Sequence, residues 1–90
     1  MHKLAYTDEA VKQISKLDER TKKDIRTAVE AIANDPSLGK PLTRELKGRF
    51  SCRVGDYRII YRIYRAEILV LILAVGHRRD IYEKMSRKNW

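Results

Sequence analysis

The sequence is poor in the residues that cross-link a chain or break its regular structure. It has one cysteine, two prolines and four glycines among 90 residues. The single cysteine, Cys52, cannot form an internal disulfide, which fits a reducing compartment. The longest apolar run, 68–75, is far too short to cross a bilayer, and acidic residues near the N-terminus stand where a signal peptide needs an apolar stretch. We therefore expect a cytoplasmic protein without a membrane partner.

Motifs for metals and nucleotides are also missing. His2 lies at the N-terminus, and neither it nor Cys52 stands at a metal-like spacing from His77. No glycine-rich phosphate-binding motif occurs. We expect no metal site and no cofactor.

Positive charge is what the sequence has in excess. The net charge is +8 at pH 7, and its distribution is uneven. Residues 1–45 carry nine basic and eight acidic side chains, whereas residues 46–90 carry eleven and four, a net +7. Arginine outnumbers lysine in the second half by eight to three, and its planar fork suits phosphate groups. A polyanionic partner is one explanation, and a basic surface that only confers solubility is the other.

Ninety residues enclose one modest core, so we expect a single domain over residues 1–90. Thr7 and Asp18 stand as N-caps before two amphipathic helices, predicted at 8–17 and 18–34. Residues 34–48 hold both prolines and read as a loop. Strands are predicted at the opening residues, at 49–54, at 57–65 and at 67–75, and a short helix at 80–87. The predicted fold is α+β: an N-terminal strand, a two-helix hairpin packed on a mostly antiparallel four-stranded sheet, and a short C-terminal helix.

The two strands on either side of Gly55 alternate between basic and apolar residues. Tyr57 and Tyr61 share the apolar parity and are expected in the core or at its rim, while the pattern leaves Tyr64 unassigned. Antiparallel pairing of these strands would gather four arginines on one face. The prediction is an arginine-lined groove on the sheet face that the helices leave free, formed by Arg49, Arg53, Arg58 and Arg62.

Three segments together resemble one known family. They are LKG at 46–48, RVGDYRIIYRI at 53–63 and AVGHRRDIY at 74–82. With the order of the predicted elements, this combination resembles the RelE/ParE toxin superfamily over essentially the whole chain. The resemblance implies a single RelE-like toxin domain with the RelE-like microbial ribonuclease fold.

The resemblance also implies an activity. It points to the toxin of a type II toxin-antitoxin system, an endoribonuclease that cleaves mRNA, typically on the ribosome, and thereby inhibits translation. In that family the 2′-hydroxyl of a nucleotide attacks its own 3′-phosphate, so no metal or bound water has to be the nucleophile. The protein must neutralise the charge of the transition state and move two protons.

By position, the resemblance implies that Arg58 and Arg78 are the catalytic arginines and Tyr82 the reactive tyrosine. His77 stands where one member of the family has lysine. Two interpretations are equally favoured, a general acid or base and a structural polar residue at the strand end. Ser51 stands where some relatives carry lysine, which removes a strand lysine as a base. The residues expected to hold RNA are Lys47, Arg49, Ser51, Arg53 and Arg62.

The expected partners follow from the same resemblance. A cognate, acidic RelB-like antitoxin would cover the arginine groove or displace the helix at 80–87, and operator DNA would be contacted only by the toxin-antitoxin complex. Two other functions stay open. One is a ParE-like inhibitor of DNA gyrase without nuclease activity, which the GHR segment and Tyr82 argue against. The other is a degenerate relative that only binds antitoxin and operator DNA.

Overall fold

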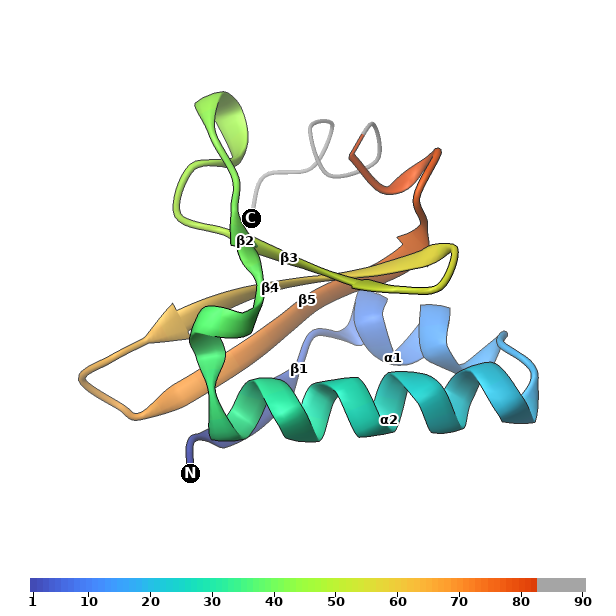
Figure 1. The fold of residues 1–90 in the computed structure, drawn as a ribbon, viewed down its shortest axis with the longest axis horizontal. Helices are drawn as coiled ribbons and strands as arrows, with labels where there is room; N and C mark the ends of the chain where they lie inside the picture. Colours follow the sequence, from blue (N-terminus) through green and yellow to red (C-terminus); the bar gives the residue numbers. More distant parts are fainter. Residues whose placement is uncertain (83–90) are drawn as a thin grey trace.

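The fold is a five-stranded sheet with two helices on one face (Figure 1). The structure is a computed structural model, and it describes residues 1–82. The strand order is β1-β5-β4-β3-β2, and among these strands β1 and β5 form the only parallel pair. The elements are β1 Lys3–Tyr6, α1 Asp8–Ser15, α2 Glu19–Asn34, η1 Pro36–Leu38, β2 Lys40–Pro41, η2 Arg44–Leu46, β3 Phe50–Val54, β4 Tyr57–Tyr64 and β5 Leu69–His77. The predicted α+β class, with paired helices on a mostly antiparallel sheet, is confirmed.

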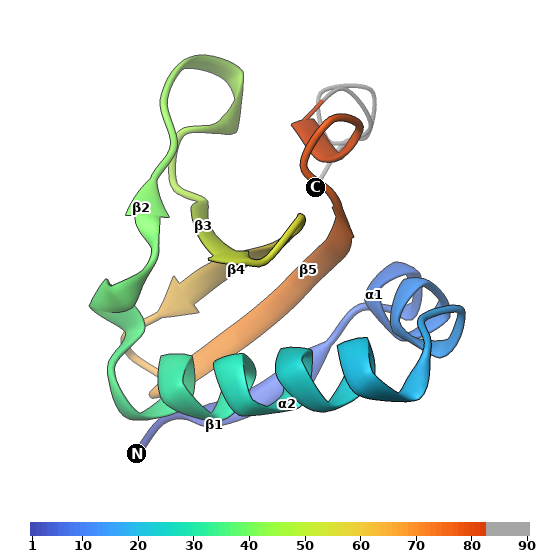
Figure 2. The same ribbon diagram turned by 45° about the vertical axis from the view of Figure 1, so that its right-hand side comes forward.

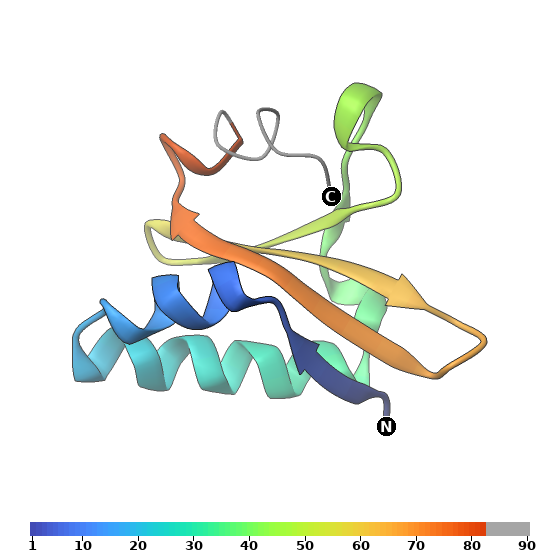
Figure 3. The same ribbon diagram turned by 180° about the vertical axis from the view of Figure 1, so that it is seen from behind.

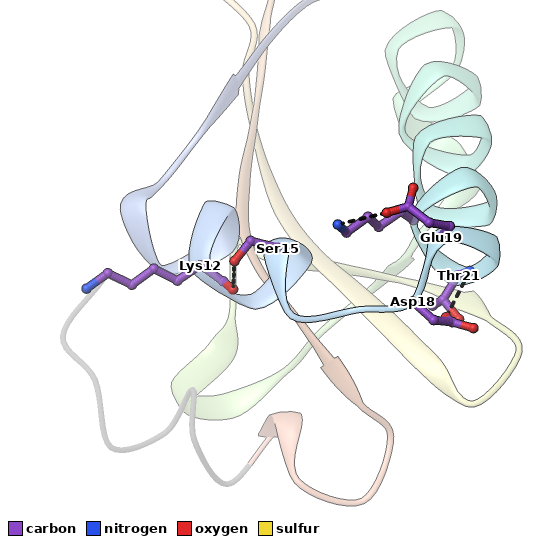
Figure 4. A network of polar contacts seen from close by, with 6 residues as sticks. Lys12, Ser15, Asp18, Glu19 and Thr21 are labelled. Carbon is purple, nitrogen blue, oxygen red and sulfur yellow. Dashed lines mark hydrogen bonds and ion pairs between the residues drawn. The ribbon is translucent and has the colours of Figure 1, made fainter.

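Both helices begin at the predicted caps. The Thr7 hydroxyl accepts the backbone N–H of Ala10 at 3.1 Å, and Asp18 accepts that of Thr21 at 3.1 Å. Figure 4 shows the Asp18 cap and the last turn of α1, where the Ser15 hydroxyl donates to the Lys12 carbonyl at 2.7 Å. These bonds satisfy backbone groups that the ends of a helix leave without partners.

The main core lies between the helices and the sheet. The parity predicted for β4 is confirmed, because Tyr57, Ile59, Tyr61 and Ile63 all pack into this core. Its buried members are Ala10, Ile25, Val29, Ile32, Ile59, Tyr61, Val70, Ile72 and Val75. The other side of the sheet has a smaller cluster of Ile60, Leu73, Ala74 and Ile81, with Leu42, Leu46, Leu71 and Tyr82 packed against it. The central strand β5 is therefore covered on both faces, as its continuous apolar run predicts.

A β-bulge changes the parity of β5. Ile60 pairs with Ala74, but the next residue of β4, Tyr61, pairs with Ile72, so Leu73 is an extra residue on β5. Leu73 and Ala74 consequently pack into the same small cluster although they are consecutive. The bulge shifts the side chains that follow it to the opposite face from the one that simple alternation would assign.

Helix α1 supplies the hydrogen bonds that the bulged part of β5 lacks. β1 pairs with β5 only as far as Tyr6 and Ile72, and both strands run in the same direction (Figure 3). Just beyond, the Thr7 hydroxyl donates to the Leu73 carbonyl at 2.6 Å, and the Gln13 side chain accepts the Val75 N–H at 2.7 Å. Beyond the end of β1, the side chains of Thr7 and Gln13 thus make hydrogen bonds to the β5 backbone in place of a neighbouring strand.

Several details differ from the sequence prediction. Helix α1 ends at Ser15 rather than 17, and strand β5 ends at His77 rather than 75. The loop predicted at 34–48 contains a fifth strand, β2, which is only two residues long and includes Pro41, so it has no alternation to detect. Strand β5 begins at Leu69 rather than 67, because Ile68 has a left-handed backbone with φ of 51°. Of the predicted helix at 80–87, residues 81 and 82 are helical, and 83–87 lie outside the described residues.

Within residues 1–82, no helix has the length and apolar content needed to cross a membrane.

Candidate functional site

The candidate site lies on the sheet face opposite the two helices. Figure 2 shows that the segment around η2 and the residues after β5 both rise from this face. Leu42 and Leu46 from the first segment, and Ile81 and Tyr82 from the second, pack on the small cluster of β4 and β5. This packing fixes the two segments against the strands that carry the arginines.

Tyr82 is the centre of the site. Its hydroxyl oxygen lies 2.9 Å from the Oγ of Ser51 on β3, and either atom could be the donor. The guanidinium carbon of Arg58 on β4 lies 5.6 Å from the centroid of its ring, within the range of a cation-π contact. Residues from β3, β4 and the segment after β5 thus meet at one phenol.

Arg58 has a donor to offer to a ligand. Its Nε is buried and makes no hydrogen bond to residues 1–82. Buried donors normally have partners, and an arginine donor is suited to a phosphate or carboxylate oxygen. Arg58 thus sets a cation beside the ring of Tyr82, whose hydroxyl can exchange a proton.

Gly76 allows Tyr82 to approach the sheet. Gly76 is the register partner of Arg58, and Ile81 packs directly over it. A Cβ at position 76 would lie 2.8 Å from the Cδ1 of Ile81, closer than real contacts allow. Ile81 is fully buried, and it holds the adjacent Tyr82 beside Arg58.

The other predicted catalytic residues lie at the end of β5. The backbone N–H of Arg78 donates to the Asp56 carbonyl at 2.8 Å, which ties the segment to the β3–β4 turn. The Arg78 side chain is exposed, and among the described residues it forms no hydrogen bond or ring contact with Arg58 or Tyr82. His77 packs edge-on against Tyr57 with ring centroids 5.9 Å apart, and its Nδ1 accepts the Arg79 N–H at 3.2 Å. Tyr57 belongs to the helix-side core, so the contacts of His77 are those of a structural residue, and its catalytic role stays a prediction.

The residues predicted to bind RNA are spread over the same face. Arg53 and Arg58 are register partners, and Arg53 is exposed with its Nε bonded to the Gly55 carbonyl at 3.2 Å. Arg49 donates to the Glu45 carbonyl at 3.4 Å. Lys47 is exposed after η2, while Arg62 lies over Tyr64 further along β4.

Like charges on directly opposed residues such as Arg53 and Arg58 destabilise a sheet, and a bound anion would relieve that repulsion.

The sequence prediction did not include the contact of Ser51 with Tyr82 or the packing of Ile81 over Gly76. Ser51 is only 4% exposed, and its hydroxyl meets Tyr82 rather than solvent. The small size of Gly76 in a strand of bulky residues was the available signal, since a glycine inside a strand often marks a close approach. The pairing of Ser51 with Tyr82 had no signal in the sequence, because 31 positions separate them.

Among residues 1–82, no three His, Cys, Asp or Glu side chains gather as a metal-binding group.

Comparison with known proteins identifies similar sequences. Residues 4–82 match the family described as ParE toxin of type II toxin-antitoxin system, parDE. The toxin RelG of Mycobacterium tuberculosis (strain ATCC 25618 / H37Rv) is 55% identical over 47 residues, which are 52% of this chain and 54% of RelG. The toxin RelE of the same strain is 40% identical over 52 residues, 57% of this chain and 54% of RelE. The matched segments thus span about half the length of these relatives.

Similar solved structures cover more of the chain. In the toxin-antitoxin complex RelBE2 from Mycobacterium tuberculosis, one chain superimposes with a TM-score of 0.78 and 38% identity, over 86% of this chain and 98% of that one. The isolated E. coli RelE toxin superimposes with a TM-score of 0.75 over 97% of both chains, at 16% identity. At that identity the likeness is one of fold alone.

Proposed function

The chain belongs to the ParE toxin family of type II toxin-antitoxin systems, within the RelE/ParE superfamily, and from this premise we propose that it is a metal-independent endoribonuclease that cleaves mRNA. One observation carries the proposal. Arg58, with a buried and unused donor, lies against the ring of Tyr82, whose hydroxyl is held by Ser51. This is the arrangement needed to bind a phosphate beside a proton-transfer group.

The proposed reaction is a transesterification within the RNA. The 2′-oxygen of a nucleotide forms a bond to the phosphorus of its own 3′-phosphate, and the bond from phosphorus to the next 5′-oxygen breaks. The products are a 2′,3′-cyclic phosphate and a 5′-hydroxyl. One group takes the proton of the 2′-hydroxyl, and another returns a proton to the leaving oxygen, so the reaction consumes no water.

In this scheme, Arg58 binds the phosphate and neutralises charge in the transition state, and Tyr82 transfers a proton. Arg78 is proposed as a second cation, reaching the phosphate from its exposed position after β5. Arg53, the register partner of Arg58, extends the positive surface on which the RNA lies. Fixed cations of this kind contribute most when they are placed before the substrate arrives.

We further propose that the chain acts on ribosome-bound mRNA and is silenced by an acidic RelB-like antitoxin, with operator DNA bound only by the complex. Support for an antitoxin comes from the similar solved structures, which include toxin-antitoxin complexes of RelE with RelB. The excess of basic residues in the second half of the sequence suits both RNA and an acidic polypeptide. Such charge complementarity predicts that antitoxin binding weakens with salt.

The test is cleavage of mRNA by the purified chain, added in parallel to free mRNA with a chelator and to mRNA bound to ribosomes. The wild-type chain should produce ends with a cyclic phosphate. Arg58→Ala and Tyr82→Phe should each lower the rate by about 10²-fold, as removal of a transition-state donor does elsewhere. Arg20→Ala, in the exposed part of α2, is a matched control that should cleave normally. Losses below about tenfold in both site variants, with folding intact, would remove these residues from the active site.

An experiment in cells separates the proposal from gyrase inhibition. After induction, early arrest of protein synthesis with cut transcripts is the expected result. DNA damage with continued translation would instead identify a ParE-like gyrase inhibitor. Neither effect would leave a protein that only binds antitoxin.

A further inference from the structure

The far half of β4 carries a second arginine-aromatic contact that the proposed reaction does not use. The guanidinium carbon of Arg62 lies 5.3 Å from the centroid of the Tyr64 ring. Both side chains are half-buried, and their register partners on β5 are Leu71 and Leu69. The ring and the guanidinium therefore lie beside leucine side chains of β5 and remain partly exposed to solvent.

Arg62 and Tyr64 share a face with the candidate site. The alternate residues of β4, from Tyr57 to Ile63, pack into the helix-side core, so Arg58, Arg62 and Tyr64 occupy the opposite face. β4 is one continuous strand from the β3–β4 turn to the hairpin with β5 (Figure 1). The six steps of extended strand from Arg58 to Tyr64 span about 20 Å, which is the length of a few nucleotides.

The chemistry of this pair fits a nucleobase better than a protein side chain. Aromatic rings and guanidinium planes in a positively charged groove are the usual platforms for bases of single-stranded nucleic acids. Arg58 and Arg62, which share this face, place two cations along the same path. A strand with this alternation of cations and an aromatic ring can follow the backbone of a polyanion while one base stacks.

We propose that Arg62 and Tyr64 form a stacking subsite for single-stranded RNA, a few nucleotides away from the phosphate bound at Arg58. This subsite rests on the proposed function, since it extends the same RNA-binding face. It gives the chain affinity for a longer RNA without contributing to bond cleavage.

Binding of RNA that cannot react tests the subsite apart from catalysis. Fluorescent 2′-O-methyl oligouridines, in which the attacking hydroxyl is blocked, are used at lengths of about two and about twelve nucleotides. Tyr64→Leu should weaken binding of the longer oligonucleotide about tenfold, the size expected for loss of one stacked base, and leave the shorter one unchanged. Tyr64→Phe keeps the ring and should bind both normally. Tyr6→Leu, an exposed tyrosine of β1, is the matched control.

A second measurement needs no substitution. The longer oligonucleotide, with 5-iodouridine at single positions, is cross-linked by light to the wild-type chain, and the modified peptide is sequenced by mass spectrometry. Modification of Tyr64 from positions a few nucleotides along the RNA is the expected result. Modification confined to residues around Tyr82 would overturn the subsite.

The outcomes distinguish this inference from the function on which it rests. If the wild-type chain neither binds nor cleaves RNA, the proposed function fails and the subsite with it. If the wild-type chain binds both lengths but Tyr64→Leu weakens both equally, or neither, only the subsite is wrong. Unchanged RNA binding by Tyr64→Leu together with weaker binding to a protein partner would make the pair a protein contact and also overturn the proposal.

Discussion

The hydroxyl oxygens of Ser51 and Tyr82 lie 2.9 Å apart, in a site where Ser51 is almost completely buried. This contact directs the Tyr82 hydroxyl toward β3 and leaves the ring beside Arg58. A hydroxyl that both donates and accepts can hold Tyr82 in either protonation state. We therefore propose that Ser51 positions the tyrosine, while its predicted contact with RNA stays a prediction.

Replacing Ser51 by alanine should slow cleavage without weakening RNA binding. A single neutral hydrogen bond contributes about 1 kcal/mol, which corresponds to roughly a fivefold lower rate. Single-turnover cleavage and the affinity for uncleavable RNA measure the two effects separately. Ser15→Ala removes an exposed serine of α1 and should change neither. A Ser51→Ala chain that loses RNA affinity but keeps its rate would place Ser51 in the binding surface after all.

Replacing Gly76 by alanine should displace Tyr82 by pushing Ile81 away from the sheet. The added Cβ would lie 2.8 Å from Ile81 Cδ1, and the backbone of Gly76 does not need the left-handed region, so this clash is the main cost. Cleavage should fall at least tenfold, because small misplacements of reacting groups are costly. The double variant Gly76→Ala with Ile81→Val lacks the clashing atom and should recover most of the rate.

The variant Ile81→Val alone is the control for this pair. It removes one buried methyl group, at a stability cost of about 1 kcal/mol, and should keep most of the activity. Chemical denaturation of all three variants separates stability from rate. If the double variant is as impaired as Gly76→Ala, then Ile81 does not transmit the effect, and Gly76 acts in another way.

Much of the fold could be predicted from local patterns. Thr7 and Asp18 were found as caps because the capping residue stands next to the helix it begins, and the parity of β4 followed from its strict alternation. The bulge at Leu73 could not be found, because a run that is apolar on both faces has no alternation to break. The Ser51–Tyr82 contact could not be found either, because it joins positions 31 apart, although Gly76 inside a strand indicates the close approach of Ile81.

Replacing Gln13 by alanine should destabilise the fold through the bulged part of β5. Gln13 accepts the Val75 N–H at 2.7 Å, and the loss leaves a largely buried donor without a partner. The expected cost is about 1–3 kcal/mol in the free energy of unfolding, measured by urea denaturation. Because the Gln13 amide donates to Glu9 at 3.5 Å, the control is the double variant Gln13→Glu with Glu9→Gln. It keeps an acceptor oxygen for Val75 without pairing two carboxylates, and it should be less affected. Equal losses in the two variants would show that helix packing, and not this hydrogen bond, is responsible.

Tyr61 should make the fold sensitive to alkaline pH. Its hydroxyl is buried, donates to the Pro36 carbonyl at 2.6 Å and accepts the Gly39 N–H at 2.9 Å. Burial raises the pKa of Tyr61 above its ordinary value, although the bond from Gly39 acts in the opposite direction. The unfolded phenol loses its proton near pH ~10, while the folded phenol still keeps it. The stabilisation is therefore complete below about pH 10 and is lost as the pH rises through the folded pKa.

The variant Tyr61→Phe tests this pH dependence. At neutral pH it should be less stable than the wild-type chain by about 1–3 kcal/mol, because the Pro36 carbonyl and the Gly39 N–H lose their partner. Since phenylalanine does not titrate, that difference should shrink as the pH rises above about 10. Urea midpoints across this pH range measure it, with Tyr64→Phe as the control for a hydroxyl that makes no hydrogen bond to the described residues. A difference that stays constant with pH would mean that Tyr61 ionises equally in the folded and unfolded chains.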